Sequence, residues 1–210
     1  MVNDYITVKA NGSYEIEVKK SRFICSLFRI TSESQAKEQI HRIKKEHWKA
    51  SHNCNAFVLG ERNEIQRSSD DGEPSGTAGV PILEVLKKQE VSNVLAVVTR
   101  YFGGTKLGAG GLIRAYTHAV SEGISQIGLV KGVLQKEIIV TLSYSLLSKL
   151  EHFIEHSNYF IKNIDYAQDV TVYCLVQKQQ VKIFESDIIN LLNSQCSLKI
   201  GTEVYTEIPL

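Results

Sequence analysis

The sequence has little of what marks membrane, secreted or fibrous proteins. No apolar run approaches the ~20 residues that a membrane-spanning helix needs, and the first residues lack the basic stretch and apolar core of a secretory signal. Only 3 prolines and 14 glycines occur in 210 residues, which excludes a collagen-like chain. The 4 cysteines lie far apart, without Cys-x-x-Cys spacing. We therefore expect reduced, mostly buried thiols in a cytoplasmic protein that makes no contact with membranes.

Charge is nearly balanced over the whole chain but not within its two parts. The net charge is +1, which by itself indicates no polyanion partner. Residues 1–135 carry 18 basic and 14 acidic side chains, whereas residues 136–210 carry 6 and 9. A basic front and an acidic back indicate two units with different surfaces. We predict an N-terminal domain over residues 1–133 and a C-terminal domain over residues 134–210.

Apolar spacing predicts alternating strands and helices in the first domain. Asn11-Gly12 stands between two alternating segments and is typical of a two-residue hairpin turn, because both central residues of that turn need positive φ. Val94–Val98 is a continuous apolar run, which predicts a strand buried on both faces. The expected strands are 6–8, 14–18, 24–30, 55–59, 64–67 and 94–98, and the expected helices are 32–48, 81–89 and 112–127.

The second domain has a compact pattern of its own. Strands are expected at 138–142, 160–166, 170–176 and 200–205, with helices near 146–153 and 181–191. This β-α-β-β-α-β order is the split β-α-β, ferredoxin-like arrangement, with two helices on one face of a sheet. The fold class that we predict is therefore α+β with two domains.

The strongest chemical signal is the glycine-rich loop at 103–111. The buried strand before it delivers Arg100 and Tyr101, and the loop opens a helix whose first N–H groups lack intrahelical acceptors and carry partial positive charge. Glycines let a ligand approach the backbone, cationic side chains add charge, and an aromatic ring offers a face for a base. The candidate phosphate- or nucleic-acid-binding residues are Arg100, Tyr101, Gly103, Gly104, Lys106, Gly108, Gly110, Gly111 and Arg114.

A plainer interpretation of the same loop stays open. In it the glycines only turn the chain and let the helix pack closely, and Phe102 belongs to the core. The nucleotide-binding motifs do not fit in detail. Gly103 and Gly108 have the spacing of the two P-loop glycines, but Ala109-Gly110 stands where Lys-Ser/Thr is required.

A second polar loop, residues 68–79, is the other candidate wall of this site. We expect it to contribute Glu73, Ser75, Gly76 and Thr77. Its acidic side chains suit a hard cation, but a solvated acidic turn is the favoured interpretation of Asp70 and Asp71, and we predict no metal and no cofactor. No spacing marks a nucleophile elbow or a Ser–His–Asp set. His52 and Cys54 are interpreted as a structural histidine and a buried thiol, so no catalytic residue is predicted.

The two loops together form a long pattern. It runs over Gly72-Glu73-Pro74-x-Gly76-Thr77-x-Gly79-x-Pro81 and over Arg100-Tyr101-Phe102-Gly103-Gly104-x-x-Leu107-Gly108-x-Gly110-Gly111-Leu112-x-Arg114-Ala115-Tyr116. Lys20-Ser21-Arg22-Phe23 and His52-x-Cys54 fit the same pattern. These residues resemble the IMPACT family, and most closely its bacterial YigZ/YvyE-type members, which append a second small domain. The resemblance covers essentially the whole chain.

The resemblance implies a fold for each domain. The N-terminal domain is expected to have the left-handed β-α-β fold of a small-subunit ribosomal protein domain, elongation factor G domain IV and the GHMP small-molecule kinases. The C-terminal domain is expected to be similar to elongation factor G domain V. Eukaryotic relatives regulate translation with a different appended domain, which this chain lacks, so their specific mechanism is not expected here.

Three functions follow from these features. The first is a non-enzymatic, translation-associated regulator that binds RNA, the ribosome or a translation factor through the basic glycine-rich loop, where phosphate or sulfate would also bind. The second is an enzyme that acts on a phosphorylated small molecule, with a phosphate cradle like that of the GHMP kinases. The glycine-loop serine of those kinases is absent, and fold analogy alone does not establish an activity. The third is a protein-docking module that binds no nucleic acid.

Overall fold

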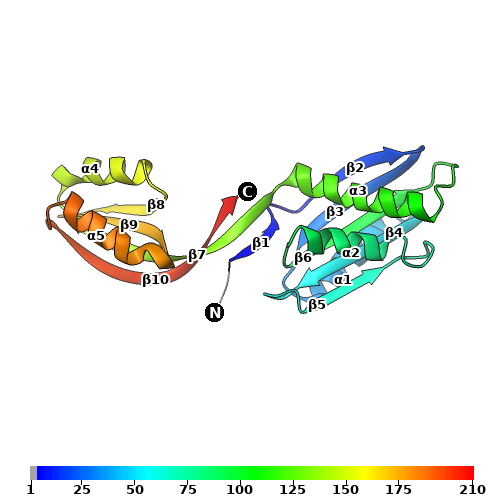
Figure 1. The fold of residues 1–210 in the computed structure, drawn as a ribbon, viewed down its shortest axis with the longest axis horizontal. Coiled ribbons are helices and arrows are strands. Elements are labelled where there is room, and N and C mark those ends of the chain that lie inside the picture. The colour runs from blue at the N-terminus through cyan, green and yellow to red at the C-terminus, as the bar shows by residue number, and fades with distance from the viewer. Residues whose placement is uncertain (1–3) are drawn as a thin grey trace. The chain divides into compact units, whose positions relative to one another are not determined.

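The computed structural model describes residues 4–210, and their contacts divide them into two units. The N-terminal unit comprises Asp4–Gly132 with Ile208–Leu210, and the C-terminal unit comprises Val133–Glu207. Each unit combines helices with a sheet (Figure 1), which confirms the mixed α/β, two-domain fold class. No helix in the described range is both long and apolar enough to cross a membrane. Residues 1–3, on which part of the expectation of no secretory signal rests, lie outside that range.

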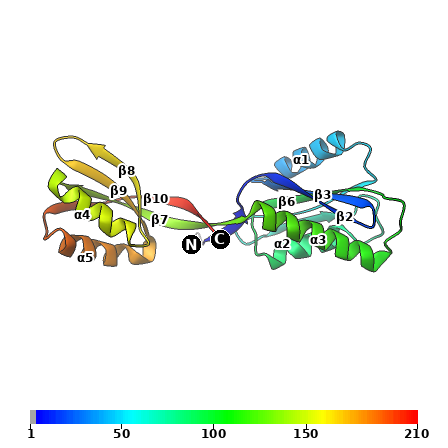
Figure 2. The ribbon, with the colours of Figure 1, turned by 90° about the horizontal axis from the view of Figure 1, so that it is seen from above.

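The N-terminal unit is a five-stranded antiparallel sheet between two helical layers. The sheet order is β2 (Gly12–Val18), β3 (Ser21–Arg29), β6 (Val94–Tyr101), β4 (His52–Leu59) and β5 (Ile65–Ser69). Helices α2 (Gly79–Lys88) and α3 (Ala109–Ile127) cover one face, and α1 (Glu33–Glu46) covers the other (Figure 2).

The central strand β6 belongs to both of the cores that these layers enclose. Val94, Ala96 and Val98 pack toward α2 and α3, whereas Leu95 and Val97 pack toward α1. All five are fully buried, because successive side chains of a strand point to opposite faces. The prediction of a strand buried on both faces is confirmed, and its end delivers residues 99–101 to one edge of the unit.

The C-terminal unit has the predicted β-α-β-β-α-β order. Its elements are most of β7 (Leu129–Leu142), then α4 (Tyr144–Glu155), β8 (Phe160–Tyr166), β9 (Val170–Gln177), the 3₁₀ turn Lys178–Gln180, α5 (Val181–Leu191) and most of β10 (Cys196–Pro209). The sheet order is β8-β9-β7-β10. Helices α4 and α5 lie on the same side of this sheet (Figure 2) and bury Leu150, Ile154, Phe184 and Ile188 against it.

The chain's last residues return to the N-terminal unit. The backbone N–H of Leu210 donates to the carbonyl oxygen of Leu129 at 3.1 Å, and Ile208–Leu210 group with Asp4–Gly132. The sequence alone places residues 134–210 in one domain, because nothing local marks a pairing of residues 208–210 with a segment so distant along the chain.

The predicted hairpin at Asn11-Gly12 is wrong. Strand β1 (Tyr5–Val8) pairs with the first four residues of β7, not with β2. Neither Asn11 nor Gly12 has positive φ. The Asn11 side chain instead accepts a hydrogen bond from the backbone N–H of Arg29 at 2.8 Å. The Asn11-Gly12 sequence, which is typical of a turn, therefore supplies a side-chain acceptor to the end of β3 instead.

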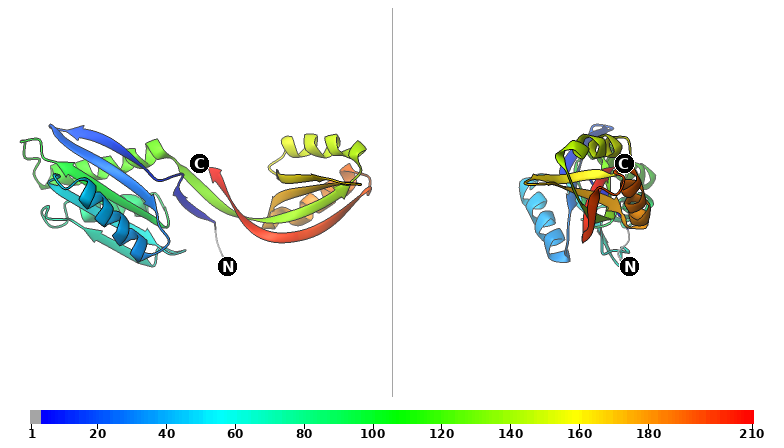
Figure 3. Two further views of the ribbon diagram at one scale, coloured as in Figure 1. Left: turned by 180° about the vertical axis from the view of Figure 1, so that it is seen from behind. Right: turned by 90° about the vertical axis from the view of Figure 1, so that its left-hand side faces the viewer.

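The tight hairpin turn is at Lys19-Lys20, between β2 and β3. Val18 pairs with Ser21, and the two lysines between them have φ of 48° and 68°. The strands lie side by side up to this turn (Figures 1 and 3). Positive φ at both central residues normally selects Asn-Gly, and a side chain there costs about 1–2 kcal/mol per residue. The lysines are therefore held in a strained conformation at an exposed tip.

We expect the double substitution Lys19→Asn and Lys20→Gly to raise the free energy of unfolding by about 1–2 kcal/mol, because it removes this strain. Urea unfolding of the whole protein measures the change. The control is Lys19→Ala with Lys20→Ala, which removes the same charge but keeps two side chains at positive φ. An equal gain in both variants would show that charge repulsion, not backbone strain, is being relieved.

Candidate functional site

The 68–79 loop meets the end of β6 in a buried ion pair. Arg100 Nη1 donates to Glu73 Oε1 at 2.7 Å, and the residues are only 5% and 8% exposed. Tyr116, fully buried on α3, donates its hydroxyl to the same carboxylate oxygen at 2.8 Å. One carboxylate thus joins the 68–79 loop, the central strand and the helix that follows the glycine-rich loop.

The neighbours of this pair come from the start of β4. His52 Nε2 lies 3.9 Å from Glu73 Oε2, and the Cys54 thiol donates to the carbonyl oxygen of Asp70 at 2.9 Å. Burial raises the pKa of the Cys54 thiol to about 12 and also raises the pKa of Tyr116. Both groups are therefore protonated at neutral pH, and Cys54 is not a nucleophile there.

This placement revises the expected roles of the residues at the end of β6. Arg100 is enclosed, its Nε has no hydrogen-bond partner among residues 4–210, and its guanidinium lies 5.5 Å from the ring centres of Phe23 and Phe102. Because Arg100 and Glu73 face each other inside the unit, neither presents charge to an external phosphate. Phe102, expected in the core, is 49% exposed.

Tyr101 is engaged on both sides. Its hydroxyl hydrogen-bonds with His47 Nδ1 at 2.9 Å, and the Arg22 guanidinium lies 5.3 Å from its ring centre. The half-buried ring therefore already has protein partners where the sequence suggested a free stacking surface.

The acidic residues of the first loop hold its backbone. The Asp70 carboxylate accepts three backbone N–H groups, from Gly76 at 2.9 Å, Ala78 at 3.0 Å and Gly79 at 2.8 Å. It thereby caps α2, whose N-cap residue Ala78 offers no side-chain acceptor. The expectation that Asp70 belongs to a solvated acidic turn is wrong. The N–H groups that its carboxylate accepts lie at and before the start of α2, several residues later in the sequence, so the local pattern did not reveal this contact.

Asp71 has the same kind of role. Its carboxylate accepts from the backbone N–H of Asn53 at 2.6 Å and from Lys44 Nζ at 2.5 Å, so it too is bound by the protein rather than by solvent alone. Across residues 4–210, no three His, Cys, Asp or Glu side chains are grouped so that they could hold a metal.

The other residues of the 68–79 loop do not converge with the glycine-rich loop on one surface. Thr77 is buried and donates its hydroxyl to the carbonyl oxygen of Pro74 at 2.6 Å. Ser75 is exposed. Gly76 lines a separate pocket of about 340 Å³, between α2 and α3, with Val80 and Ile113.

The start of α3 does present free backbone donors. Its cap residue Gly108 has φ 71° and ψ 167°, a conformation open essentially only to glycine. The N–H groups of Ala109, Gly110 and Gly111 make no hydrogen bond with the described chain. A Cβ built on Gly110 would meet no atom within 4 Å. These donors, at the positive end of a helix dipole, are open to a ligand.

Two unpaired cations flank those donors in the sequence. Lys106 and Arg114 are exposed and form no hydrogen bond or ion pair within residues 4–210. A pocket of about 390 Å³ brings Arg114 and Lys19 next to Gly111; it is lined by Val18, Lys19, Leu107, Gly111, Arg114, Ala115 and His118, with no acidic side chain. We call Lys19, Lys106, Arg114 and the N–H groups of residues 109–111 the α3 basic surface. The sequence analysis did not identify Lys19 as a site residue. The available signal was the pair of lysines, Lys19 and Lys20, between two predicted strands.

The glycines of the loop divide between the two interpretations. A Cβ on Gly103 would lie 2.0 Å from the backbone of Lys20, and the Gly103 N–H donates to Ser21 Oγ at 3.1 Å. Gly103 therefore serves close packing against the hairpin. Gly104 and Gly108 have open space around them but positive φ of 87° and 71°, so they serve to turn the chain. Gly110 has open space and no positive φ, so neither packing nor a turn explains it.

Comparison with known proteins agrees with this architecture. The Impact N-terminal domain model matches residues 19–124, and a domain of unknown function (DUF1949) matches residues 140–195. IMPACT family member YvyE of Bacillus subtilis (strain 168) is 47% identical over 207 residues, covering 99% of this chain and 95% of that protein. The chain belongs to the IMPACT family.

Further relatives extend over both units. IMPACT family member YigZ of Escherichia coli (strain K12) is 33% identical and covers 87% of this chain and 90% of its own length. A solved structure titled "Crystal structure of an hypothetical protein" is 30% identical, with a TM-score of 0.59, over 94% of this chain and 97% of that one. The resemblance to the bacterial, two-domain members of the IMPACT family is thereby confirmed.

Removing one partner of the buried pair should be costly. We expect Arg100→Met to lower the free energy of unfolding by about 3–5 kcal/mol, because the Glu73 carboxylate stays buried without its cation. Adding Glu73→Gln to this variant should recover part of the loss. Urea unfolding measures both. The control is Arg22→Met, which breaks an exposed ion pair with Glu15 at 2.7 Å and the contact with the Tyr101 ring and should cost no more than about 2 kcal/mol. Equal losses at the two arginines would contradict the structural role of the pair.

The Asp70 cap should make stability depend on pH. Desolvation acts to raise the pKa of Asp70, but the N–H groups of Gly76, Gly79 and Ala78 outweigh it, and the pKa lies below its usual value. The stabilisation is therefore complete above the unfolded-state pKa of about 3.9 and is lost as pH falls through the folded-state value. Asp70→Asn turns one of the two acceptor oxygens into an NH2 donor, which should cost about 1–3 kcal/mol at neutral pH and flatten the acid limb of a plot of unfolding free energy against pH. Parallel curves for the two proteins would contradict the cap.

Proposed function

We propose that this IMPACT family member is a non-enzymatic, translation-associated regulator that binds RNA, the ribosome or a translation factor through the α3 basic surface. The observation that carries the proposal is the coincidence of unpaired cations with unpaired backbone N–H groups at one helix start. The link to translation comes from the family resemblance, whose eukaryotic members regulate translation.

The chemistry of this surface suits a phosphodiester backbone. Helix N-terminal N–H groups bind phosphate oxygens, and Lys106 and Arg114 add full charges without an internal acid to neutralise them. The adjacent pocket has an apolar wall of Val18, Leu107 and Ala115, against which a sugar or base can pack. A nucleic-acid strand, which combines phosphates with sugars and bases, therefore fits this surface better than a free inorganic phosphate ion.

Engagement of the acidic residues favours binding over phosphoryl transfer. The kinase alternative needs Asp70, Asp71 or Glu73 to hold magnesium. Asp70 is bound by three backbone N–H groups, Asp71 by Lys44 and a backbone N–H, and Glu73 by Arg100 and Tyr116. Releasing any of these carboxylates would break the loop or the buried pair.

Protein docking has its own supporting observation. Val80 on α2 and Ile113 on α3 are 49% and 41% exposed and line the pocket of about 340 Å³ between these helices. Ile113 lies on the same helix as Arg114 of the α3 basic surface, so one translation factor can contact both. It is the second candidate.

Two finer assignments belong to the same proposal. We assign the C-terminal unit to the ferredoxin-like type, because its element order and its strand order β8-β9-β7-β10 have both helices on one face. We place the protein in the cytoplasm, because its four cysteines are free thiols.

The test removes two cations together. We expect Lys106→Ala with Arg114→Ala to lower affinity for a single-stranded RNA oligonucleotide at least tenfold at low salt. The slope of log affinity against log salt should fall by about 1.4, since each phosphate contact contributes about 0.7. Fluorescence anisotropy between about 50 and 200 mM salt measures both quantities, and co-sedimentation with purified ribosomes tests the larger partner.

Two controls separate the alternatives. Lys37→Ala with Lys45→Ala removes two exposed cations from α1, on the other face of the sheet, and should leave the affinity within twofold. Gly110→Leu places a side chain over the free N–H groups where there is space, and should weaken binding without changing the salt slope. RNA binding that survives both the double cation variant and Gly110→Leu would overturn the proposal. Ribosome binding that is lost in Val80→Asp with Ile113→Asp alone would favour protein docking.

A further inference from the structure

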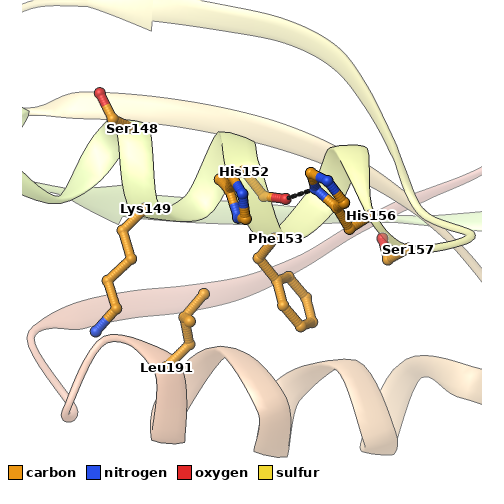
Figure 4. A pocket seen from close by; sticks show the side chains of 7 residues that line it. All are labelled: Ser148, Lys149, His152, Phe153, His156, Ser157 and Leu191. Carbon is orange, nitrogen blue, oxygen red and sulfur yellow. Dashed lines mark hydrogen bonds between the residues drawn. The ribbon is translucent and has the colours of Figure 1, made fainter.

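Helix α4 of the C-terminal unit carries two histidines one turn apart. His152 lies in the last turn of α4, and His156, four residues later, is the residue that caps the C-terminus of this helix, so both side chains lie at the same side of the helix end. Both are exposed, and their ring centres are 4.3 Å apart with the planes inclined by 28°. Figure 4 shows the two imidazoles next to each other along the helix.

One of these rings has its proton position fixed by the backbone. His156 Nδ1 lies 2.8 Å from the carbonyl oxygen of His152, drawn as the dashed line in Figure 4. A carbonyl oxygen only accepts, so Nδ1 carries the hydrogen and Nε2 of the neutral ring has a free lone pair. Metal-ligating histidines are oriented by this kind of bond to a backbone carbonyl. The ring nitrogens of His152 make no hydrogen bond or ion pair within residues 4–210, so either can act as a ligand.

The two rings open onto a pocket of about 620 Å³. It is lined by Ser148, Lys149, His152, Phe153, His156, Ser157 and Leu191. In Figure 4 the side chains of Lys149 and Phe153 extend toward α5, whose Leu191 faces them. The space leaves room for water, or for a donor from another molecule, beside the imidazoles.

We propose that His152 and His156 together bind one borderline divalent transition-metal ion, Cu²⁺, Ni²⁺ or Zn²⁺, through two imidazole nitrogens, with the exposed rings turning out of their stack so that the in-plane lone pairs meet at the ion. Imidazole is a preferred ligand of these ions, and two histidines at i and i+4 on one helix face bind zinc in known metal sites. Water fills the remaining positions. The site does not depend on the function proposed for the α3 basic surface.

The local sequence supports a binding site rather than a hydrolytic one. His152-Phe153-Ile154-Glu155-His156 has the H-x-x-E-H spacing of a group of zinc peptidases. Zinc sites of that kind need three protein ligands, and no third His, Cys, Asp or Glu joins these two in the described residues. The pair therefore forms an open, two-ligand site.

One charged neighbour bears on the proposed ligand set. Lys149 lines the same pocket one turn before His152, and its positive charge opposes a bound cation. Its removal should therefore strengthen binding, an effect that a purely structural histidine stack does not produce.

The experiment is calorimetric titration of the full chain with Ni²⁺ or Zn²⁺. We expect one ion to bind with an affinity that falls at least tenfold in His152→Ala and in His156→Ala, and that rises twofold or more in Lys149→Ala. The control is His41→Ala, an exposed histidine on α1, which should leave the affinity unchanged. Because both histidines are exposed, their removal should leave the far-ultraviolet circular dichroism of the protein unaltered.

A spectroscopic measurement identifies the ligands directly. Traces of Cu²⁺ should broaden the imidazole Cε1–H proton signals of His152 and His156 together, before those of the other histidines. Binding that persists in the double variant His152→Ala with His156→Ala, broadening of only one of the two rings, or no heat of binding would each overturn the proposal.

Discussion

The arrangement of the N-terminal unit depends on one buried carboxylate. Glu73 accepts from Arg100 at the end of the central strand and from Tyr116 in α3, all three nearly or fully enclosed. Burying an ion pair adds little net stability, because desolvation offsets the attraction, but leaving either charge alone is costly. The pair therefore constrains the relative positions of the 68–79 loop, β6 and α3. Any arrangement that separates Glu73 from Arg100 leaves a charge buried without a partner.

The buried Glu73–Arg100 pair also determines where the open N–H groups and cations of the α3 basic surface lie. Tyr116 lies two turns into α3, which begins at Ala109, so anchoring its hydroxyl anchors the helix start with its open N–H groups. Gly103 fixes the other end of the loop by close contact with the β2–β3 hairpin, and the tip of that hairpin brings Lys19 to the pocket. The buried Glu73–Arg100 pair therefore helps to position the α3 basic surface, although neither residue belongs to that surface.

The sequence predicted what depends on local pattern. Most helices and strands of both units, the doubly buried strand β6 and the two loops were visible in apolar spacing and in the family motif. The first part of β7, residues 129–137, was not predicted as a strand. The orientation of the Arg100 side chain was not predictable, because an arginine at the end of a strand can face solvent as well as a partner 27 residues away. The Asn11-Gly12 hairpin failed for a similar reason: β1 pairs with residues 129–132, and a turn signal carries no information about so distant a partner. Lys19 was missed because positive φ at a lysine runs against residue preference.

The pairing of Leu210 with Leu129 has a consequence for how the chain assembles. Residues 208–210 complete the N-terminal unit but are synthesised after the entire C-terminal unit. Vectorial folding on the ribosome can therefore build most of the first unit early, yet its final backbone contact forms only when the tail has left the exit tunnel. A fragment that stops at residue 132 would lack that contact however well the rest of it folds.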